Sequence, residues 1–209
     1  MDKSSQIEDV ILNCECGDID GLYRIGRLFE HNYHVVYVTI NNIDVVIPDP
    51  IDRSFPGTVL PELRKYPQWE KHDWKTMELR LEGDKVVVVE LDREPVHFLK
   101  EHQLLPDLPR YNLFGFNKEV RLTSITTSRV YLNDKCFIAK VAPFPYMLRR
   151  IAHEVAEYHA FVDRQTVLMP RLLGYVYEEH PDRVIGFLCE AIEGKHPGPA
   201  HRPKCCEAL

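Results

Sequence analysis

The sequence predicts an α+β protein with a β-rich N-terminal extension over residues 1–118 and a second unit over residues 119–209. Three observations predict this class. Runs rich in valine, isoleucine and tyrosine alternate with turn residues in the first part. Five similar short runs follow residue 119, and between the third and the fourth lies a longer stretch with apolar residues at helical spacing. This order predicts a five-stranded antiparallel sheet covered on one side by one main helix.

The first elements of the extension are predicted from periodicity. Residues 19–31 carry apolar side chains three and four positions apart, which predicts a helix. Residues 34–49 consist of two β-rich runs on either side of Asn41 and Asn42. Because asparagine suits tight turns between strands, this stretch predicts a hairpin.

The rest of the extension is predicted from turn residues. Residues 77–92 are two valine- and leucine-rich runs around Gly83 and Asp84, which predicts a second hairpin. Five prolines between residues 48 and 67 predict a loop. Three more between residues 93 and 112 predict a linker or an irregular segment.

The second unit is predicted with sharper boundaries. Strands are predicted at residues 119–126, 129–133, 135–142, 171–178 and 183–190. A helix is predicted over residues 146–163, with Pro145 near its first turn. One apolar stripe runs along it, formed by Leu148, Ile151, Val155, Tyr158 and Val162.

Lys140 is the residue that raises the question of function. Lys140 and Ile138 lie on the same face of the predicted strand 135–142, and both faces of that strand are otherwise apolar. A lysine in an interior strand requires a counter-charge or a polar ligand. Glu154 lies beside the apolar stripe of the following helix. We therefore expect Lys140 and Glu154 to form an ion pair, or to contact one polar ligand together.

Composition excludes several classes of partner. Hydrophobic residues make up 44% of the chain and the net charge is −6, so a globular protein is expected. The chain has no basic block, so nucleic acid is not an expected partner. No apolar run approaches the ~20 residues of a membrane span, and the expected location is the cytoplasm.

No metal site is expected from the motifs. The segment "HEVAEYH" at residues 153–159 resembles the HExxH zinc signature, but its second histidine is His159 and the signature requires one at position 157. The paired cysteines lack the two-residue gap that is usual in zinc sites. The hydroxyl side chains of residues 124–128 are explained by turn chemistry.

The order of these motifs resembles the N-terminal lobe of the protein-kinase-like superfamily, in its aminoglycoside and choline phosphotransferase branch. "FIAKVA" at residues 137–142 resembles the third strand with its lysine, and "IAHEVAEYHAF" at 151–161 the helix with its glutamate. "MPRLLGYVYEEHPDRVIGFLCEAIEG" at 169–194 resembles the last two strands and the hinge. The pattern is closest to fungal kinase-like proteins that have a long β-rich N-terminal extension.

The resemblance implies roles for eight residues. Lys140 would grip phosphates, Glu154 would hold that lysine, and Cys189 would be the gatekeeper of the groove. The remaining positions would line the groove: Ile138 and Leu188 as apolar walls, and Glu190, Ala191 and Ile192 as the hinge.

The sequence also departs from the kinase-like pattern. The hairpin over residues 121–135 has no glycine, so it is not a glycine-rich phosphate loop. The catalytic aspartate and the metal-binding residues of the family would follow the hinge, but the last aspartate is Asp182 and the last asparagine is Asn133. The expected unit is a kinase-like lobe whose C-terminal lobe is absent, and we do not expect the chain alone to transfer phosphate.

Three functions remain open on the sequence. The first is a non-phosphorylating protein that binds a small organic molecule in the retained groove, closed by residues 1–118, and promotes a metal-independent biosynthetic reaction such as a cyclisation. It needs no cofactor. The second is a truncated phosphotransferase that uses ATP with Mg²⁺ when a C-terminal lobe is supplied. The third is a pseudokinase-like interaction module, in which a second copy or another protein covers the face of the missing lobe.

Overall fold

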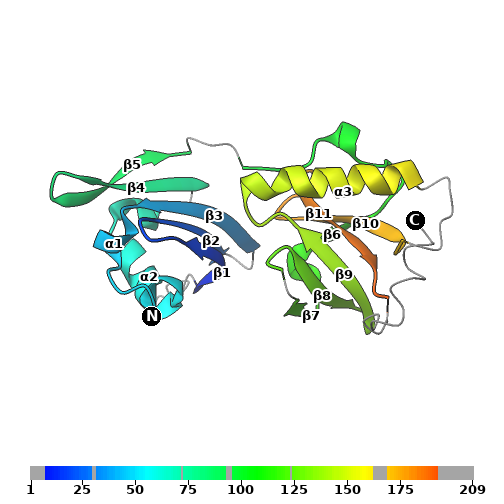
Figure 1. Cartoon of the computed structure of the whole chain (residues 1–209), viewed down its shortest axis with the longest axis horizontal. Helices are drawn as coiled ribbons and strands as arrows, with labels where there is room; N and C mark the ends of the chain where they lie inside the picture. The colour runs from blue at the N-terminus through cyan, green and yellow to red at the C-terminus, as the bar shows by residue number, and fades with distance from the viewer. Residues whose placement is uncertain are drawn as a thin grey trace, which may run out of the picture.

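The structure is a computed structural model that describes residues 8–29, 32–71, 73–92, 96–122, 124–161 and 169–192. Two β-sheets lie next to each other, one built by the N-terminal part and one by the C-terminal part (Figure 1). The main helix lies along the second sheet. The predicted α+β class, rich in β-strands, is therefore confirmed.

The N-terminal sheet has five strands in the order in which they occur in the chain. They are β1 (Glu8–Cys16), β2 (Asp20–Phe29), β3 (Asn32–Asn41), β4 (Thr76–Glu82) and β5 (Lys85–Leu91). Neighbours are antiparallel except β3 and β4, which are parallel. A parallel pair needs a crossover, and this one contains α1 (Ile43–Val46), η1 (Asp52–Ser54), α2 (Pro56–Leu63) and η2 (Pro67–Glu70).

The predicted helix over residues 19–31 is wrong, because most of that segment is strand β2. β2 pairs along its length with both β1 and β3, so its backbone groups are satisfied by neighbouring strands. Residues 21–27 are all buried or half-buried. A strand that is covered on both faces shows no alternation of apolar and polar residues. Its apolar residues can then also match the spacing of a helix. Residues 30 and 31 lie outside the described residues.

The predicted hairpin at Asn41 and Asn42 is also wrong. Asn42 adopts a left-handed conformation with φ of 64°, but the chain then enters α1 rather than a returning strand. The Ile43 N–H donates to the Ile19 carbonyl at 2.7 Å, and Ile43 and Ile47 are buried in the core on one face of the sheet. Two isoleucines four positions apart pack best from a helical turn.

The remaining predictions for this part have mixed outcomes. The hairpin over residues 77–92 is confirmed as β4 and β5, and Gly83 has the positive φ of 62° that its turn requires. The proline-rich loop predicted between residues 48 and 67 instead contains α2, with Pro56 at its first position.

The C-terminal sheet has six strands in the order β6-β10-β11-β9-β8-β7. They are β6 (Arg110–Asn112), β7 (Lys118–Arg121), β8 (Thr127–Leu132), β9 (Lys135–Val141), β10 (Leu172–Tyr177) and β11 (Val184–Glu190). The five predicted antiparallel strands are present. The sixth, β6, pairs in parallel with β10 and comes from the segment predicted to be a linker. That segment also contains η3 (Glu101–Gln103) and is followed by η4 (Leu113–Gly115).

The predicted helix over residues 146–163 is observed as α3 (Leu148–Phe161), after the short turn η5 (Pro145–Met147); residues 162 and 163 lie outside the described residues. Ile151 and Val155 of its apolar stripe are buried against β9 and β11, in one core with Phe187 and Cys189. The opposite face of the sheet has its own core, which contains Leu188. The side chains on the two faces of β11 therefore pack in different cores.

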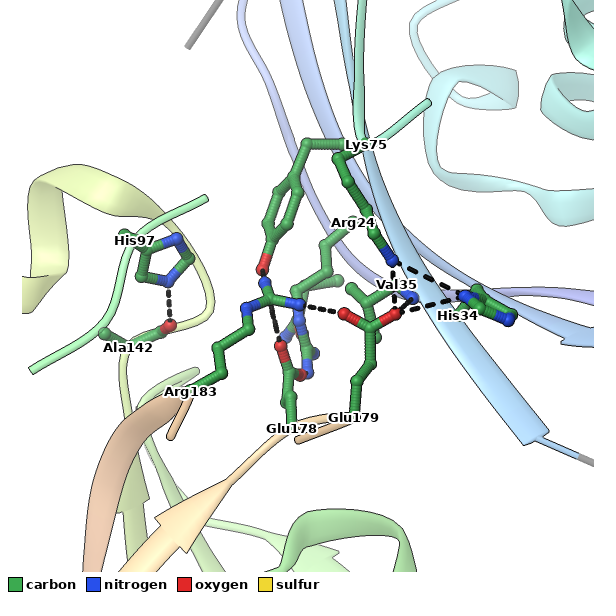
Figure 2. A network of polar contacts seen from close by, with 11 residues as sticks. Arg24, His34, Val35, Lys75, His97, Ala142, Glu178, Glu179 and Arg183 are labelled. Atoms are coloured by element: carbon green, nitrogen blue, oxygen red, sulfur yellow. Dashed lines mark hydrogen bonds and ion pairs between the residues drawn. The ribbon is translucent and has the colours of Figure 1, made fainter. Parts of the chain in front are cut away.

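The two sheets are joined by a cluster of charged side chains (Figure 2). Glu178 is fully buried and forms ion pairs with Arg24 of β2 and with Arg183, whose Nη2 lies 3.3 Å from Glu178 Oε2. Glu179 accepts from Lys75 Nζ at 2.6 Å and also pairs with Arg183. Since one set of residues comes from the turn between β10 and β11 and the other from the N-terminal sheet, the cluster fixes one sheet against the other.

Candidate functional site

Lys140 and Glu154 form the ion pair that the sequence predicts. Lys140 Nζ lies 2.6 Å from Glu154 Oε2. The strand β9 places the lysine on the helix-facing side of the sheet, and α3 places the glutamate directly over it. Side-chain exposure is 31% for Lys140 and 20% for Glu154, so the pair is open to a ligand.

Arg150 is a second cation on the same carboxylate. Its Nε lies 3.3 Å from Glu154 Oε1, one turn earlier on α3. The same helical turn lines an open surface hollow of about 790 Å³, whose wall includes Glu154, Arg149 and Arg150. Glu154 is therefore shared between the strand lysine and the solvent-facing side of the helix.

Strand register identifies the neighbours of Lys140. It lies opposite Thr127 of β8 and opposite Phe187 of β11, and directly paired residues project to the same face. Lys140 Nζ is 5.9 Å from the centre of the Phe187 ring, at the outer limit of a cation–π contact. Ile138 and its partner Arg129 continue this face.

This face of the sheet thus combines two cationic side chains, Lys140 and Arg129, with the apolar Ile138. Ile138 is half-buried and packs against the core under α3, whereas Arg129 is exposed. The sequence reasoning missed Arg129. The sequence could have indicated it, because pairing of the predicted strands 129–133 and 135–142 places Arg129 opposite Ile138.

Cys189 lies on the same face of the sheet as Lys140, opposite Ile138 in the strand register. It is buried, and it shares a hydrogen bond with the hydroxyl of Tyr158 on α3. Burial is the main cause that raises the pKa of the Cys189 thiol, and the Tyr158 hydrogen bond and the Lys140 charge oppose that rise. The thiol is therefore a neutral part of the wall.

The other predicted site residues are not all brought together. Leu188 points to the opposite face of the sheet, away from Lys140, and packs in the core around Val130 and Val176. Glu190 pairs with Arg171, whose Nη2 lies 3.1 Å from Glu190 Oε1. Ala191 is half-buried, and Ile192 beyond the end of β11 is 64% exposed. The segment predicted to be a hinge thus lies at the margin of the site.

The hairpin before Lys140 is held by hydroxyl groups. Ser124 Oγ lies 2.8 Å from Thr126 Oγ1, and the Thr126 N–H donates to Ser124 Oγ at 3.2 Å. This is the turn chemistry that the sequence predicts. The Val141 N–H donates to the Thr126 carbonyl at 2.8 Å, so the turn is tied to the strand that carries Lys140.

The two histidines of the segment that resembles the zinc signature have different partners. His153 is exposed and pairs with Glu157, whereas His159 lies 2.9 Å from the Tyr175 hydroxyl. In the part of the chain that the structure describes, no three His, Cys, Asp or Glu side chains come together as a metal site would require. Within the same described ranges, no helix is long and apolar enough to cross a membrane.

The N-terminal sheet approaches the site from the start of α3. The Tyr146 hydroxyl donates to Glu15 of β1, and Phe144 packs with Val35 and Tyr37 of β3. Ile125, at the tip of the β7–β8 hairpin, joins the same apolar cluster. The extension therefore contacts two segments that border the Lys140 site.

Comparison of the chain with protein-family models, with curated proteins and with solved structures finds no match.

Proposed function

We propose that the lysine side of the C-terminal sheet is a small-molecule site, in which Lys140, held by Glu154, binds an acidic or carbonyl oxygen of an organic ligand. The observation that carries the proposal is the geometry of the pair. Lys140 is fixed at 2.6 Å from a carboxylate, but 31% of its side chain remains exposed. A fixed and accessible ammonium can donate a further hydrogen bond at a lower cost in conformational entropy than a freely moving one.

The local charge balance favours an acidic ligand over a bare salt bridge. Glu154 already has Arg150 as a second cation, at 3.3 Å. Arg129 adds a further positive charge on the same face as Lys140. Two cations therefore share one carboxylate, and an anionic group would neutralise the remaining positive charge.

The apolar part of the ligand would lie on Ile138, which is only half-buried. Apolar walls with a few convergent polar groups are the usual composition of a small-molecule site. The resemblance to kinase-like lobes supports the same location. It makes adenine nucleotides one class of ligand to be compared with aromatic carboxylates.

The predicted result of removing the Lys140 charge is a specific loss of affinity. We expect Lys140→Met to weaken binding of the tightest ligand by roughly 10- to 100-fold, because a hydrogen bond to a charged group contributes about 1.5–3 kcal/mol. The measurement is an NMR titration with 3-phenylpropanoate, and with ADP in the presence and absence of Mg²⁺.

Lys135→Met is the matched control, because Lys135 is exposed at the start of the same strand. It should bind as the unmodified chain does. Equal affinities of the Lys140→Met variant and the unmodified chain for every probe would refute the proposal. Saturable binding of ADP that requires Mg²⁺ would instead favour the phosphotransferase alternative.

A further inference from the structure

A cavity between the two sheets carries a second inference, independent of the Lys140 site. Its volume is about 280 Å³. It lies on the face of the N-terminal sheet that is turned toward the second sheet, and its lining includes Leu22, Tyr37 and Val96. This volume is close to the lower limit of known ligand pockets.

The first polar feature of the cavity is His97, whose side chain is only 7% exposed. Its Nε2 lies 2.6 Å from the Ala142 carbonyl. Because a carbonyl only accepts, Nε2 must carry the proton, and Nδ1 of the neutral ring is then an acceptor. Nδ1 has no hydrogen-bond partner among the residues that the structure describes. A buried acceptor left unpaired is costly, unless a ligand or water satisfies it.

The ring is neutral at physiological pH. The pKa of His97 is lowered to about 4, mainly by burial; the hydrogen bond to Ala142 opposes this change, and the nearby Arg183 and Arg24 charges add to it. His97 therefore lines the cavity as a neutral ring with an unpaired acceptor at Nδ1.

The second polar feature is a pair of carboxylates. Glu78 of β4 and Glu90 of β5 lie directly opposite each other in the strand register, and both line the cavity. Like charges in this position are destabilising. Glu78 accepts from Asn41 at 2.7 Å and forms an ion pair with Arg80 at 3.0 Å. The inference therefore rests on two carboxylates lining one cavity, and not on a vacant group.

We propose that this cavity binds a small organic cation, with its ammonium group beside Glu78 and Glu90 and its apolar body against Leu22 and Val96. An N–H or O–H of the ligand donates to His97 Nδ1. A metal ion is disfavoured, because the described carboxylates and histidines nowhere gather in a group of three that could hold one.

The test is an NMR titration of the full chain with phenethylammonium, followed at the imidazole of His97. We expect a saturable shift in the millimolar range, which is reasonable for a ligand of about nine non-hydrogen atoms. The neutral analogue 2-phenylethanol should bind on the order of tenfold more weakly, because it lacks the charge-assisted contact.

Glu90→Gln removes one charge at an exposed position and should weaken phenethylammonium binding on the order of tenfold. Glu82→Gln, at an exposed position of the same β4–β5 hairpin, is the matched control and should leave the affinity unchanged. Lys140→Met should also leave it unchanged, which separates this site from the first. The proposal is overturned if the His97 signals do not shift, if 2-phenylethanol binds equally well, or if Glu90→Gln has no effect.

Discussion

Replacing Glu178 by alanine is expected to reduce the free energy of unfolding by about 3–5 kcal/mol, because the change leaves buried cations without their counter-charge. Glu178 is fully buried between Arg24 and Arg183. Arg24 is nearly as buried as its partner, and its charge cannot reach water without separating the two sheets. Arg183 retains Glu179, so most of the loss is expected from Arg24.

The measurement is equilibrium unfolding in urea. Glu157→Ala is the matched control, since this glutamate has an exposed partner on the outer side of α3 and should change stability by no more than about 0.5 kcal/mol. A loss below about 1 kcal/mol for Glu178→Ala would contradict the view that this cluster holds the sheets together.

Replacing Gly186 by alanine is expected to destabilise the C-terminal sheet by at least about 3 kcal/mol, at the upper end of overpacking effects. A Cβ at position 186 would lie 2.1 Å from the Lys140 carbonyl oxygen and 2.7 Å from the Val141 Cα. Both are backbone atoms of the neighbouring strand, so a side-chain rotation cannot relieve the clash. β9 and β11 would have to separate at the residue that carries the Lys140 ammonium.

Thermal unfolding of Gly186→Ala, compared with Gly17→Ala, tests this expectation. A Cβ at Gly17 meets only the Asp20 carbonyl, at an ordinary 3.6 Å, so the control should change stability by less than about 1 kcal/mol. If the two variants have the same stability, the close approach of β9 and β11 does not constrain the sheet.

The Lys140–Glu154 pair could be predicted because its causes are local. The alternation of side chains along strand 135–142 places Lys140 on one face, and the helical stripe places Glu154 over that face. Only fourteen residues separate them, and one strand–helix connection brings them together. The face of Leu188 is harder to predict, because β11 is apolar on both sides.

The contacts between the sheets could not be predicted in the same way. Arg24 and Glu178 lie in different sheets, and each alone looks like a surface charge in the sequence. The β2 segment likewise became a strand because β1 and β3 supply partners for its backbone, which local spacing does not encode. No pattern in the sequence indicates that His97 is buried, because its hydrogen-bond partner is the carbonyl of Ala142 in the other part of the chain.

The most direct test of the central proposal is a crystal structure of the chain with the tightest-binding acidic probe. We predict an acidic oxygen of the probe at about 2.7–2.9 Å from Lys140 Nζ, with the apolar body on Ile138 and Glu154 still in contact with the lysine. A probe bound elsewhere, with the Lys140–Glu154 pair untouched, would contradict the proposal and leave the pair a structural salt bridge.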